Sequence, residues 1–473
     1  MACFACMILG MLVVFALATE SEAEPLRLHP DNPHYFLFRG KPTVLITSGE
    51  HYGSVLNLDF DYHKYLETLA RDKMNLTRTF TGVYCEAPGN FNIAGNTLAP
   101  APGKLLCPWA RSDQPGYANG GNKFDLTRFD DAWFHRLRDF MAAASKCGVV
   151  VEMNLFCPFY EDSMWKLSPL NPANNINALG PTVANDSYTL DRNGGLLPFQ
   201  EALTRKIVAE LSDFDNLYYE VMNEPYICNV PMDWQRHITE VIVDAEKPSR
   251  RRHLISLNIA NQKAEVRDPP PAISIFNFHY AWPPETVGMN YSLGRVIGDN
   301  ETGFVGTSDF VYRREGWAFV MAGGGLYNNL DYSFTADHED GTFAYPPSQP
   351  GGGGAAFRRQ LRTLADFMAS FAFVRMAPHR DIINGTLPEG IHVEILAETG
   401  KQYAIYLCRN EPTDETAVTL KLDVPAGEYD PEWWHPQTGR ISAKSTISHN
   451  GGELALTTPP FAEDLALRLT AAH

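Results

Sequence analysis

Two glutamates in this chain stand where short, apolar, strand-like runs end, which is where catalytic carboxylates are often placed. Glu224 follows the run at residues 217–222 and precedes Pro225, which ends a strand and turns the chain into a loop. Glu301 comes soon after another apolar run at residues 295–298. Two carboxylates at one end of a barrel are the groups that hydrolyse glycosidic bonds. The sequence therefore points to acid–base and nucleophilic chemistry on a sugar.

The two carboxylates of such a pair have different tasks. In a retaining reaction one attacks the anomeric carbon, while the other protonates the leaving oxygen and then activates water. The two carboxyl groups must then be roughly 5 to 5.5 Å apart. Asn223 is expected to hold a sugar hydroxyl, a hydrogen bond that strengthens as positive charge develops on the ring. Asp299 competes with Glu301 for the attacking role, because residues two apart on a strand share a face.

The surrounding chain alternates strand-like and helical segments, after a short hairpin predicted at residues 34–42. Predicted strands cover residues 43–47, 74–80, 149–155, 217–222, 254–258, 273–278, 295–298 and 325–332. Predicted helices cover residues 60–73, 129–147, 199–211, 233–246, 312–322 and 357–374. Eight strands mostly separated by helices predict an α/β fold of the (β/α)8 TIM-barrel type. A doubly wound sheet is the alternative, but no glycine-rich phosphate loop follows an early strand.

The pattern changes near residue 381. Short, largely alternating strands are predicted at residues 390–396, 402–408, 417–423 and 465–469. They predict a small antiparallel β-sandwich. We therefore expect a signal peptide at residues 1–23, a barrel at 24–380 and a β-sandwich accessory domain at 381–473.

Composition narrows the possible partners. The 473 residues are 44% hydrophobic, enough for a large core, and the formal net charge is −17. A polyanion needs a basic footprint, so nucleic acid and anionic membranes are not expected partners. A neutral carbohydrate substrate is compatible with this charge.

The N-terminal 18 residues are apolar and lead into an acidic stretch. This pattern predicts a secretory signal, no membrane span once it is removed, and a secreted protein, extracellular or periplasmic. An uncleaved anchor or a misassigned start is the alternative, because no Lys or Arg precedes the apolar run.

Six cysteines lie beyond the predicted signal, and none of these has the CxxC spacing of a zinc site. No metal site and no cofactor are expected. Cys85 and Cys107 flank a loop and either form a disulfide or remain thiols. Asn-x-Ser/Thr sequons occur at Asn75, Asn185, Asn290, Asn300 and Asn384. We interpret them as chance matches, because a glycan on Asn300 would block the cleft beside Glu301.

The Asn223-Glu224 pair after the fourth predicted strand and Glu301 after the seventh resemble glycoside hydrolase clan A. The resemblance implies that Glu224 is the acid/base and Glu301 the nucleophile. It places Arg78 where the clan often keeps an arginine bonded to the nucleophile, and such a cation holds a carboxylate ionised by lowering its pKa.

The same resemblance extends to residues around the nucleophile and beyond the barrel. His279 and Tyr280 match the clan's histidine or aromatic pair, and Tyr280 is expected to donate to Glu301. With Arg78, they are expected to contact substrate. Residues 313–325, 366–378 and 429–439 are similar to apiosidase-like barrels that carry an appended domain once labelled collagen-binding.

The first strand departs from that family. It ends in Ser48-Gly-Glu-His-Tyr52, where those barrels carry a Gly-Asp-Thr-Ala-Trp type of run. Glu50, His51 and Tyr52 are nevertheless expected to contact substrate, since strand ends line the pocket. Trp282 is expected to stack on a sugar ring, with plain packing as the alternative.

The sequence thus predicts a secreted retaining glycoside hydrolase acting on a plant or microbial poly- or oligosaccharide. The alternatives are a non-catalytic carbohydrate-binding or scaffold protein on the same barrel, and a transglycosylase. The long loops at residues 81–122 and 156–197 are expected to wall off an exo-type pocket.

Overall fold

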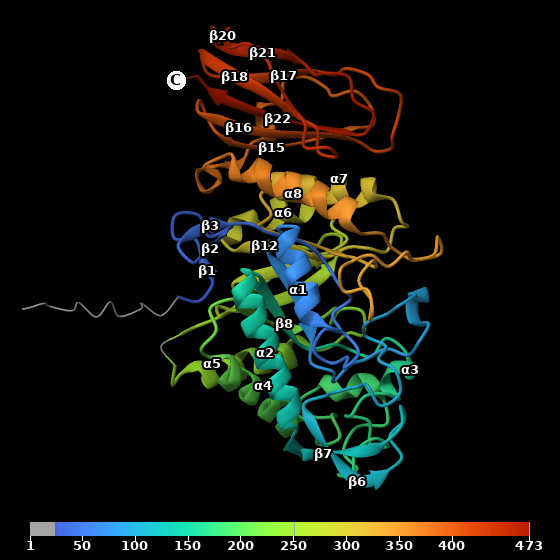
Figure 1. The fold of residues 1–473 in the computed structure, drawn as a ribbon. Coiled ribbons are helices and arrows are strands. Elements are labelled where there is room, and N and C mark those ends of the chain that lie inside the picture. The colour runs from blue at the N-terminus through green and yellow to red at the C-terminus, as the bar shows by residue number, and fades with distance from the viewer. Residues whose placement is uncertain (1–23, 250, 473) are drawn as a thin grey trace, which may run out of the picture.

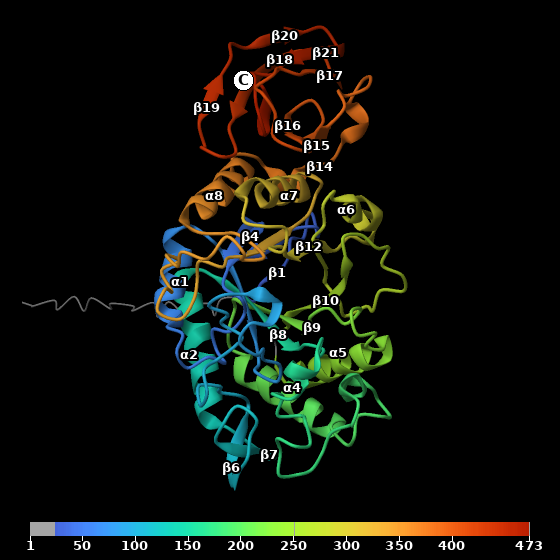
Figure 2. The same cartoon turned by 90° about the vertical axis from the view of Figure 1, so that its right-hand side faces the viewer.

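A parallel eight-stranded barrel forms the body of the protein, and the (β/α)8 prediction is confirmed (Figures 1 and 2). The computed structural model describes residues 24–249 and 251–472. The strands follow the order β4-β13-β12-β11-β10-β9-β8-β5. Their bounds are β4 Leu45–Gly49, β5 Leu76–Phe80, β8 Val150–Phe156, β9 Leu217–Met222, β10 Leu254–Asn261, β11 Ile275–His279, β12 Val296–Glu301 and β13 Leu326–Leu330.

Helices surround this barrel. They are α1 Tyr62–Arg71, α2 Asp131–Cys147, α3 Asp162–Trp165, α4 Leu197–Leu211, α5 Met232–Glu246, α6 Glu285–Asn290, α7 Asp309–Met321 and α8 Ala355–Ala369. Short 3-10 turns occur at Asn90–Asn92, Ala184–Tyr188, Tyr291–Leu293, Phe373–Arg375 and Arg380–Ile382. Side-chain caps set some helix starts: Asp130 accepts from the backbone of Ala132, so α2 begins at Asp131. Left-handed Gly148 ends the same helix.

A side chain joins the two strands at the seam of the barrel. Within the described residues the ladder order ends at β4 and β5. Asn75 bridges them: its Oδ1 accepts from the Ile46 N–H at 2.8 Å, and its Nδ2 donates to the Val44 carbonyl at 2.9 Å. The barrel is therefore nearly closed, with one amide side chain replacing part of a ladder.

The barrel interior changes from apolar to polar along its axis. At the N-terminal end of the strands lies a buried apolar layer of Leu45, Leu76, Val150, Tyr218, Ile275, Val296 and Leu326. The predicted N-terminal hairpin is confirmed by strands β2 Phe36–Phe38 and β3 Lys41–Thr43, joined by β1 Arg27–Leu28, and Phe36 packs on that layer. Two residues further along the strands the inward positions turn polar, with Arg78, Glu152 and Glu220 buried there. The buried polar and charged residues of the barrel interior thus lie in its C-terminal half.

One predicted loop contains regular structure. Residues 81–122 were expected to be loop, but β6 Trp109–Pro115 pairs with β7 Asn122–Phe129. The strands of this hairpin are mostly polar and partly exposed, so they lack the apolar alternation that marks a strand in sequence.

The C-terminal domain is antiparallel, as predicted. One sheet orders β14 Ala377–Pro378, β15 Ile391–Glu398, β16 Gln402–Arg409, β22 Asp464–Ala471, β18 Gly427–Trp434 and β19 Ile441–Ala443, with β20 Ile447–His449 also on β18. A smaller sheet pairs β17 Thr419–Val424 with β21 Gly452–Thr457. β14 joins the large sheet before residue 381, and β18, which was not predicted, carries Trp433 into the core.

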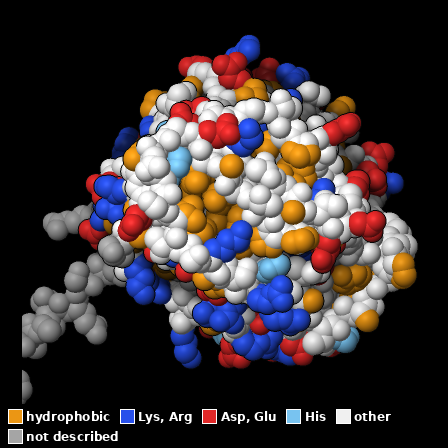
Figure 3. Space-filling model, turned by 90° about the horizontal axis from the view of Figure 1, so that it is seen from above, with side chains coloured by type: hydrophobic (Ala, Val, Ile, Leu, Met, Phe, Trp, Pro, Cys, Tyr) orange, Lys and Arg blue, Asp and Glu red, His pale blue; other side chains and the backbone are white. Residues whose placement is uncertain are grey.

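This domain packs on α7 and α8 of the barrel (Figures 1 and 2). Arg313 of α7 is buried and forms an ion pair with Asp464 of β22 at 2.8 Å. The Trp317 ring stacks on Tyr406 of β16, with ring centroids 5.3 Å apart. Figure 3, which looks onto this end of the molecule, shows acidic and basic side chains mixed with apolar ones.

The predicted signal at residues 1–23 lies outside the described residues. Among the helices that are described, none is long and apolar enough to cross a bilayer.

Candidate active site

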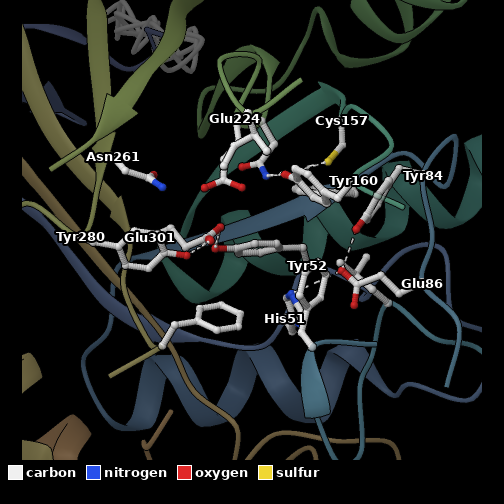
Figure 4. Close-up of a pocket in the computed structure, with 16 residues that line it drawn as sticks. His51, Tyr52, Tyr84, Glu86, Cys157, Tyr160, Glu224, Asn261, Tyr280 and Glu301 are labelled. Atoms are coloured by element: carbon white, nitrogen blue, oxygen red, sulfur yellow. Dashed lines mark hydrogen bonds and ion pairs between the residues drawn. The ribbon is translucent and has the colours of Figure 1, made fainter. Parts of the chain in front are cut away.

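A pocket of about 210 Å³ lies at the C-terminal ends of the barrel strands (Figure 4). Both predicted catalytic carboxylates, Glu224 and Glu301, face it. The other residues that line it are His51, Tyr52, Phe80, Tyr84, Glu86, Phe91, Leu98, Cys157, Tyr160, Asn223, Ile227, Asn261, Tyr280 and Phe304. Aromatic rings and carboxyl groups thus dominate its wall, a combination that suits both faces and hydroxyls of a sugar.

A β-bulge turns Glu301 into the pocket. The register of β12 against β11 shifts, so that Asp299 pairs with Phe278 and Glu301 pairs with the next residue, His279. Regular alternation is therefore broken at Asn300, and a bulge of this kind re-aims the following side chain. Asp299 does not line the pocket, although alternation would have given it the face of Glu301.

Instead, Asp299 is buried against α7. Burial raises its pKa well above the ordinary value, and the neighbouring charge of Glu315 raises it further. A carboxyl held away from the pocket in this state is unsuited to attack a sugar.

Glu301 is held on both carboxylate oxygens. Tyr280 donates to Oε1 at 2.6 Å, and Tyr52 donates to Oε2 at 2.9 Å. Arg78 also donates to Oε2, through Nη1 at 3.2 Å. The two tyrosines have positive φ angles, 63° for Tyr52 and 54° for Tyr280, which residues with side chains seldom adopt. Left-handed residues of this kind concentrate at sites where a rigid frame fixes a reactive group.

Glu224 is placed by the end of β9. Its φ is 39°, also in the left-handed region, and its backbone N–H donates to Asn258 Oδ1 at 3.1 Å. Tyr226 donates to the carboxylate at 3.3 Å. Pro225 follows directly, as the sequence indicated, so the carboxylate stands at the mouth of the barrel.

Glu224 and His279 form a hydrogen-bonded pair. His279 Nδ1 lies 3.0 Å from Glu224 Oε1 and 3.6 Å from Glu301 Oε1. Burial raises the pKa of Glu224, but the hydrogen bond and charge of His279 outweigh it and leave that pKa below its usual value. Burial lowers the pKa of His279, but the charges of Glu301 and Glu224 outweigh it, so the pKa is raised. The pair therefore keeps one proton next to Glu301.

The two carboxylates are close together. An oxygen of Glu224, an oxygen of Glu301 and a ring nitrogen of His279 all lie within 4.8 Å of one another. Retaining glycosidases place their carboxyl groups about 5 to 5.5 Å apart, and inverting ones about 6.5 to 9.5 Å apart. The bound of 4.8 Å between these oxygens lies below the range of inverting enzymes.

Arg78 connects this pocket to the polar barrel interior. Its guanidinium donates to Glu301, to Glu152 at 2.6 Å and to Glu220. It also donates to Asn223 Oδ1 at 2.6 Å, and Asn223 Nδ2 in turn donates to the Tyr160 hydroxyl at 2.7 Å. Asn223 is thus fixed beside Glu224 by partners on both ends of its amide.

Four predicted substrate-binding residues do not line the pocket: Glu50, Trp282, and also Arg78 and His279, whose bonds to the glutamates are described above. The carboxylate of Glu50 accepts from the backbone N–H groups of Gly53 and Ser54 and from the Thr97 hydroxyl at 2.5 Å, so it shapes the loop after β4. Trp282 packs against Arg314 and His392, 5.0 Å from the latter ring, at the boundary with the C-terminal domain. Arg78 and His279 bond the carboxylates of Glu301 and Glu224 from behind, so the substrate-binding prediction is corrected for all four residues.

His51 and Tyr52, from the same segment as Glu50, do line the pocket. Tyr52 bonds Glu301, as described above. Burial lowers the pKa of His51 to about 4, so its ring is neutral near pH 7.

Several pocket residues were not predicted because they come from loops. Tyr84, Glu86 and Phe91 follow β5, Tyr160 follows β8 and Phe304 follows β12. Loop positions carry no periodic pattern that marks them in a sequence. Glu152 and Glu220, by contrast, could have been noticed as charged residues inside otherwise apolar strands.

The described cysteines are all unpaired. Cys85 and Cys107 are buried thiols, so the disulfide considered from the sequence is not formed. Cys157 lines the pocket, and burial raises its pKa, which keeps it a protonated, weakly nucleophilic thiol.

Comparison with known proteins places the fold. No protein-family model and no curated protein matches the chain. A glycoside hydrolase family 5 structure from Bacteroides vulgatus is similar over 94% of this chain and 93% of its own, with 11% identity and a TM-score of 0.62. A second protein of that organism, whose glycoside hydrolase assignment is provisional, is 13% identical over 96% of this chain and 83% of its own, with a TM-score of 0.65. Another glycoside hydrolase is 12% identical over 95% and 97% of the two chains, with a TM-score of 0.62. Because these similarities cover both the barrel and the C-terminal sheets, the chain has the two-part fold of these glycoside hydrolase structures.

Proposed function

We propose that the protein is a retaining glycoside hydrolase in which Glu301 is the nucleophile and Glu224 the acid/base. The observation that carries the proposal is the meeting of these two carboxylates, from β9 and β12, within 4.8 Å in one pocket. The fold shared with glycoside hydrolase structures supports it, since that barrel builds its active sites at this end.

The proposed reaction has two steps. Glu301 attacks the anomeric carbon and forms a glycosyl ester, while the leaving oxygen takes a proton from Glu224. Glu224 then removes a proton from water, which attacks the anomeric carbon and displaces the Glu301 carboxylate, so the sugar is released with its original anomeric configuration.

The neighbours of the two glutamates fit these steps. Tyr52, Tyr280 and Arg78 hold Glu301 as an oriented, charged nucleophile. His279 supplies a partner with which Glu224 can exchange a proton as its task changes from acid to base. Asn223, anchored by Arg78, stands next to Glu224 where a sugar hydroxyl would bind.

We further propose exo-type action on a terminal sugar of a poly- or oligosaccharide. The pocket volume of about 210 Å³ is below the roughly 300 to 1,000 Å³ of pockets that take drug-sized ligands. Phe91 and Phe304, from loops after β5 and β12, lie 6.2 Å apart edge to face and narrow the pocket. Release of terminal monosaccharides from a defined oligosaccharide supports this proposal, and cleavage in mid-chain contradicts it.

The first experiment is a screen of the purified protein against aryl glycosides and plant and microbial polysaccharides, with Glu301→Gln and Glu224→Gln beside it. A matching 2-fluoro glycoside should label Glu301, and mass spectrometry of the peptide identifies the site. Labelling at another carboxylate, or activity that survives Glu301→Gln, overturns the assignment. Binding of sugars without turnover favours the non-catalytic carbohydrate-binding protein, and transfer to added acceptor sugars favours a transglycosylase.

The cluster of Glu224, His279 and Glu301 also has a spacing that a metal ion could use. A metal-assisted hydrolase is therefore a second candidate. Dialysis against a chelator separates the two: activity that persists supports the double displacement, and loss that zinc restores supports the metal.

Export is part of the proposal and rests on the apolar N-terminal segment. N-terminal sequencing of the protein recovered from the medium or periplasm should find a chain that starts near residue 24. A full-length chain in the cytoplasmic fraction contradicts it.

A further inference from the structure

Glu86 is a pocket carboxyl for which the proposed reaction has no use. It lies in the loop after β5, is 3% exposed and lines the same pocket as Glu224 and Glu301. Figure 4 shows His51 and Tyr52 between Glu86 and Glu301. Glu86 therefore faces the part of a bound sugar that is remote from the reacting carbon.

The carboxylate of Glu86 is oriented but not saturated. Tyr84 donates to Oε1 at 2.9 Å, and Asn96 donates to Oε2 at 2.5 Å. His51 Nε2 is 3.9 Å from Oε1, too far for a hydrogen bond. A carboxylate has about four acceptor positions, so each Glu86 oxygen keeps about one that no described side chain fills. Each oxygen thus has one donor from the protein and one further acceptor position that a ligand hydroxyl could occupy.

Burial and nearby charges also affect the pKa of Glu86. Burial raises the pKa of Glu86 to about 7, against the lowering effect of its bonds from Asn96 and Tyr84. The charges of Glu301 and Glu161 raise it further. Two donors from a substrate would favour the ionised carboxylate.

We propose that Glu86 is the specificity-determining residue of the pocket, accepting hydrogen bonds from two neighbouring hydroxyls of a neutral sugar. The two free acceptor positions sit on the two oxygens of one carboxylate, which matches a vicinal diol. This inference rests on the proposed function, because it concerns the sugar held over Glu301.

The charge of the pocket indicates a neutral sugar. Three of the residues that line it carry carboxyl groups, and none is Lys or Arg. The guanidinium of Arg78 is 2% exposed and already bonded to Glu152, Glu220, Asn223 and Glu301. A uronic acid would bring a further carboxylate into this pocket without a free cation to meet it.

His51 also lies on this side of the pocket. Its Nδ1 is buried and has no hydrogen-bond partner among the described residues. That nitrogen is enclosed by protein, so it adds no contact to a sugar in the pocket.

The test combines variants with altered substrates. Once the screen has identified the preferred aryl glycoside, kcat/KM is measured for its monodeoxy analogues with wild type, Glu86→Gln and Glu161→Gln. Glu161 is an exposed neighbour whose charge acts on Glu86 but which does not line the pocket, so Glu161→Gln is the matched control. In wild type, removal of either of two adjacent hydroxyls should lower kcat/KM about 10- to 100-fold.

In Glu86→Gln the same two deoxy penalties should shrink to a few-fold, whereas in Glu161→Gln they should persist. Penalties that are unchanged in Glu86→Gln overturn the proposal, as does a wild type with no adjacent pair of sensitive positions. Preferred turnover of a uronide or of a cationic amino sugar overturns the neutral class. If Glu86→Gln does not fold, Glu86→Asp, which keeps the charge but withdraws both oxygens by one methylene, gives the same comparison.

Failure of the proposed function gives a different result. In that case wild type turns over no glycoside and a fluorinated sugar does not label Glu301. Calorimetric titration of wild type and Glu86→Gln with neutral monosaccharides and their deoxy analogues then tests recognition alone. Binding that requires two adjacent hydroxyls in wild type and loses this requirement in Glu86→Gln supports the inference, and binding that is equal in both proteins overturns it.

Discussion

Carboxylates occur at two levels of this barrel, and Arg78 contacts both. Glu224 and Glu301 at the mouth are 8% and 5% exposed and reach the pocket, whereas Glu152 and Glu220 below them are fully enclosed. The enclosed pair is bonded by the amides of Asn154, Asn277 and Asn300 and by the Tyr218 hydroxyl. The pair at the mouth is held by fewer, longer side chains and keeps acceptor positions free.

This difference separates the two glutamates proposed to react with substrate from the two that hold Arg78 in place. A carboxylate whose acceptor positions are filled by the protein cannot attack or protonate a substrate. It can, however, fix Arg78, which in turn holds Glu301. Burial raises the pKa of Glu152 to about 8 despite the opposing charge of Arg78.

Glu301→Gln should have the largest effect, because it removes the proposed attacking atom from the upper level. We expect kcat on an aryl glycoside to fall by at least about 10⁴-fold. Initial rates with wild type and variant, with circular dichroism to confirm folding, measure this. Substantial residual activity would move the nucleophile elsewhere.

Glu224→Gln should have an effect that depends on the leaving group. With a poor leaving group, the loss of the acid should lower kcat by about 10²- to 10⁴-fold. With an acidic leaving group such as dinitrophenol, bond cleavage needs little protonation, so the first step should be much less affected. Pre-steady-state release of the phenol measures that step. An equal loss with both leaving groups would contradict the acid/base role.

Glu152→Gln tests the lower level through stability. The pKa of Glu152 is raised from 4.5 to about 8 by folding. Between these values the folded protein keeps a proton that the unfolded chain has released. The contribution to the free energy of unfolding is therefore full below about pH 4.5 and is lost as pH rises through 8. Glutamine does not titrate, so the variant should lose less stability between pH 5 and 9 than wild type.

Urea unfolding at the two pH values measures this difference. A residual slope should remain in the variant, because burial also raises the pKa values of Glu86 and Glu315. We expect kcat to change by less than about tenfold, under about 1.4 kcal/mol of transition-state free energy. An unchanged slope would show that Glu152 is ionised in the folded protein. A loss of activity as large as that of Glu224→Gln would show that the enclosed glutamates are as important for turnover as those at the mouth.

Trp282→Ala should have the smallest effect on turnover, because Trp282 lies at the boundary with the C-terminal domain. Its ring is 4.2 Å from the Arg314 guanidinium carbon. Loss of this packing should lower the free energy of unfolding by about 1 to 3 kcal/mol. The value of kcat/KM should stay within about threefold of wild type. A large rise in KM would return Trp282 to the substrate-binding residues.

The regular part of the barrel could be predicted from the sequence, because strands and helices there alternate with clear periodicity. The predicted strand at residues 217–222 coincides with β9, and this placed Glu224 at a strand end. Each barrel strand overlaps its predicted segment, since apolar β-branched runs bounded by turns are distinctive.

The irregular part could not be predicted. The bulge at Asn300 separates Asp299 from Glu301, and nothing local in Gly-Asp-Asn-Glu marks it. Glu86 depends on how a loop returns over the barrel, which is a tertiary property. Glu50 was expected in the pocket from its position alone. Its carboxylate instead accepts hydrogen bonds from the backbone N–H groups of Gly53 and Ser54.

The amide of Asn75 at the barrel seam has a consequence for how the protein can be produced. Asn75 and Asn300 both lie in glycosylation sequons, and both amides are used inside the fold, one between β4 and β5 and the other on Glu152 and Glu220. Oligosaccharyltransferase acts on chains that have not yet folded, and a glycan on either amide would remove these bonds. Expression in a eukaryotic secretory host should therefore give misfolded, glycosylated material, whereas a bacterial host should give the active barrel.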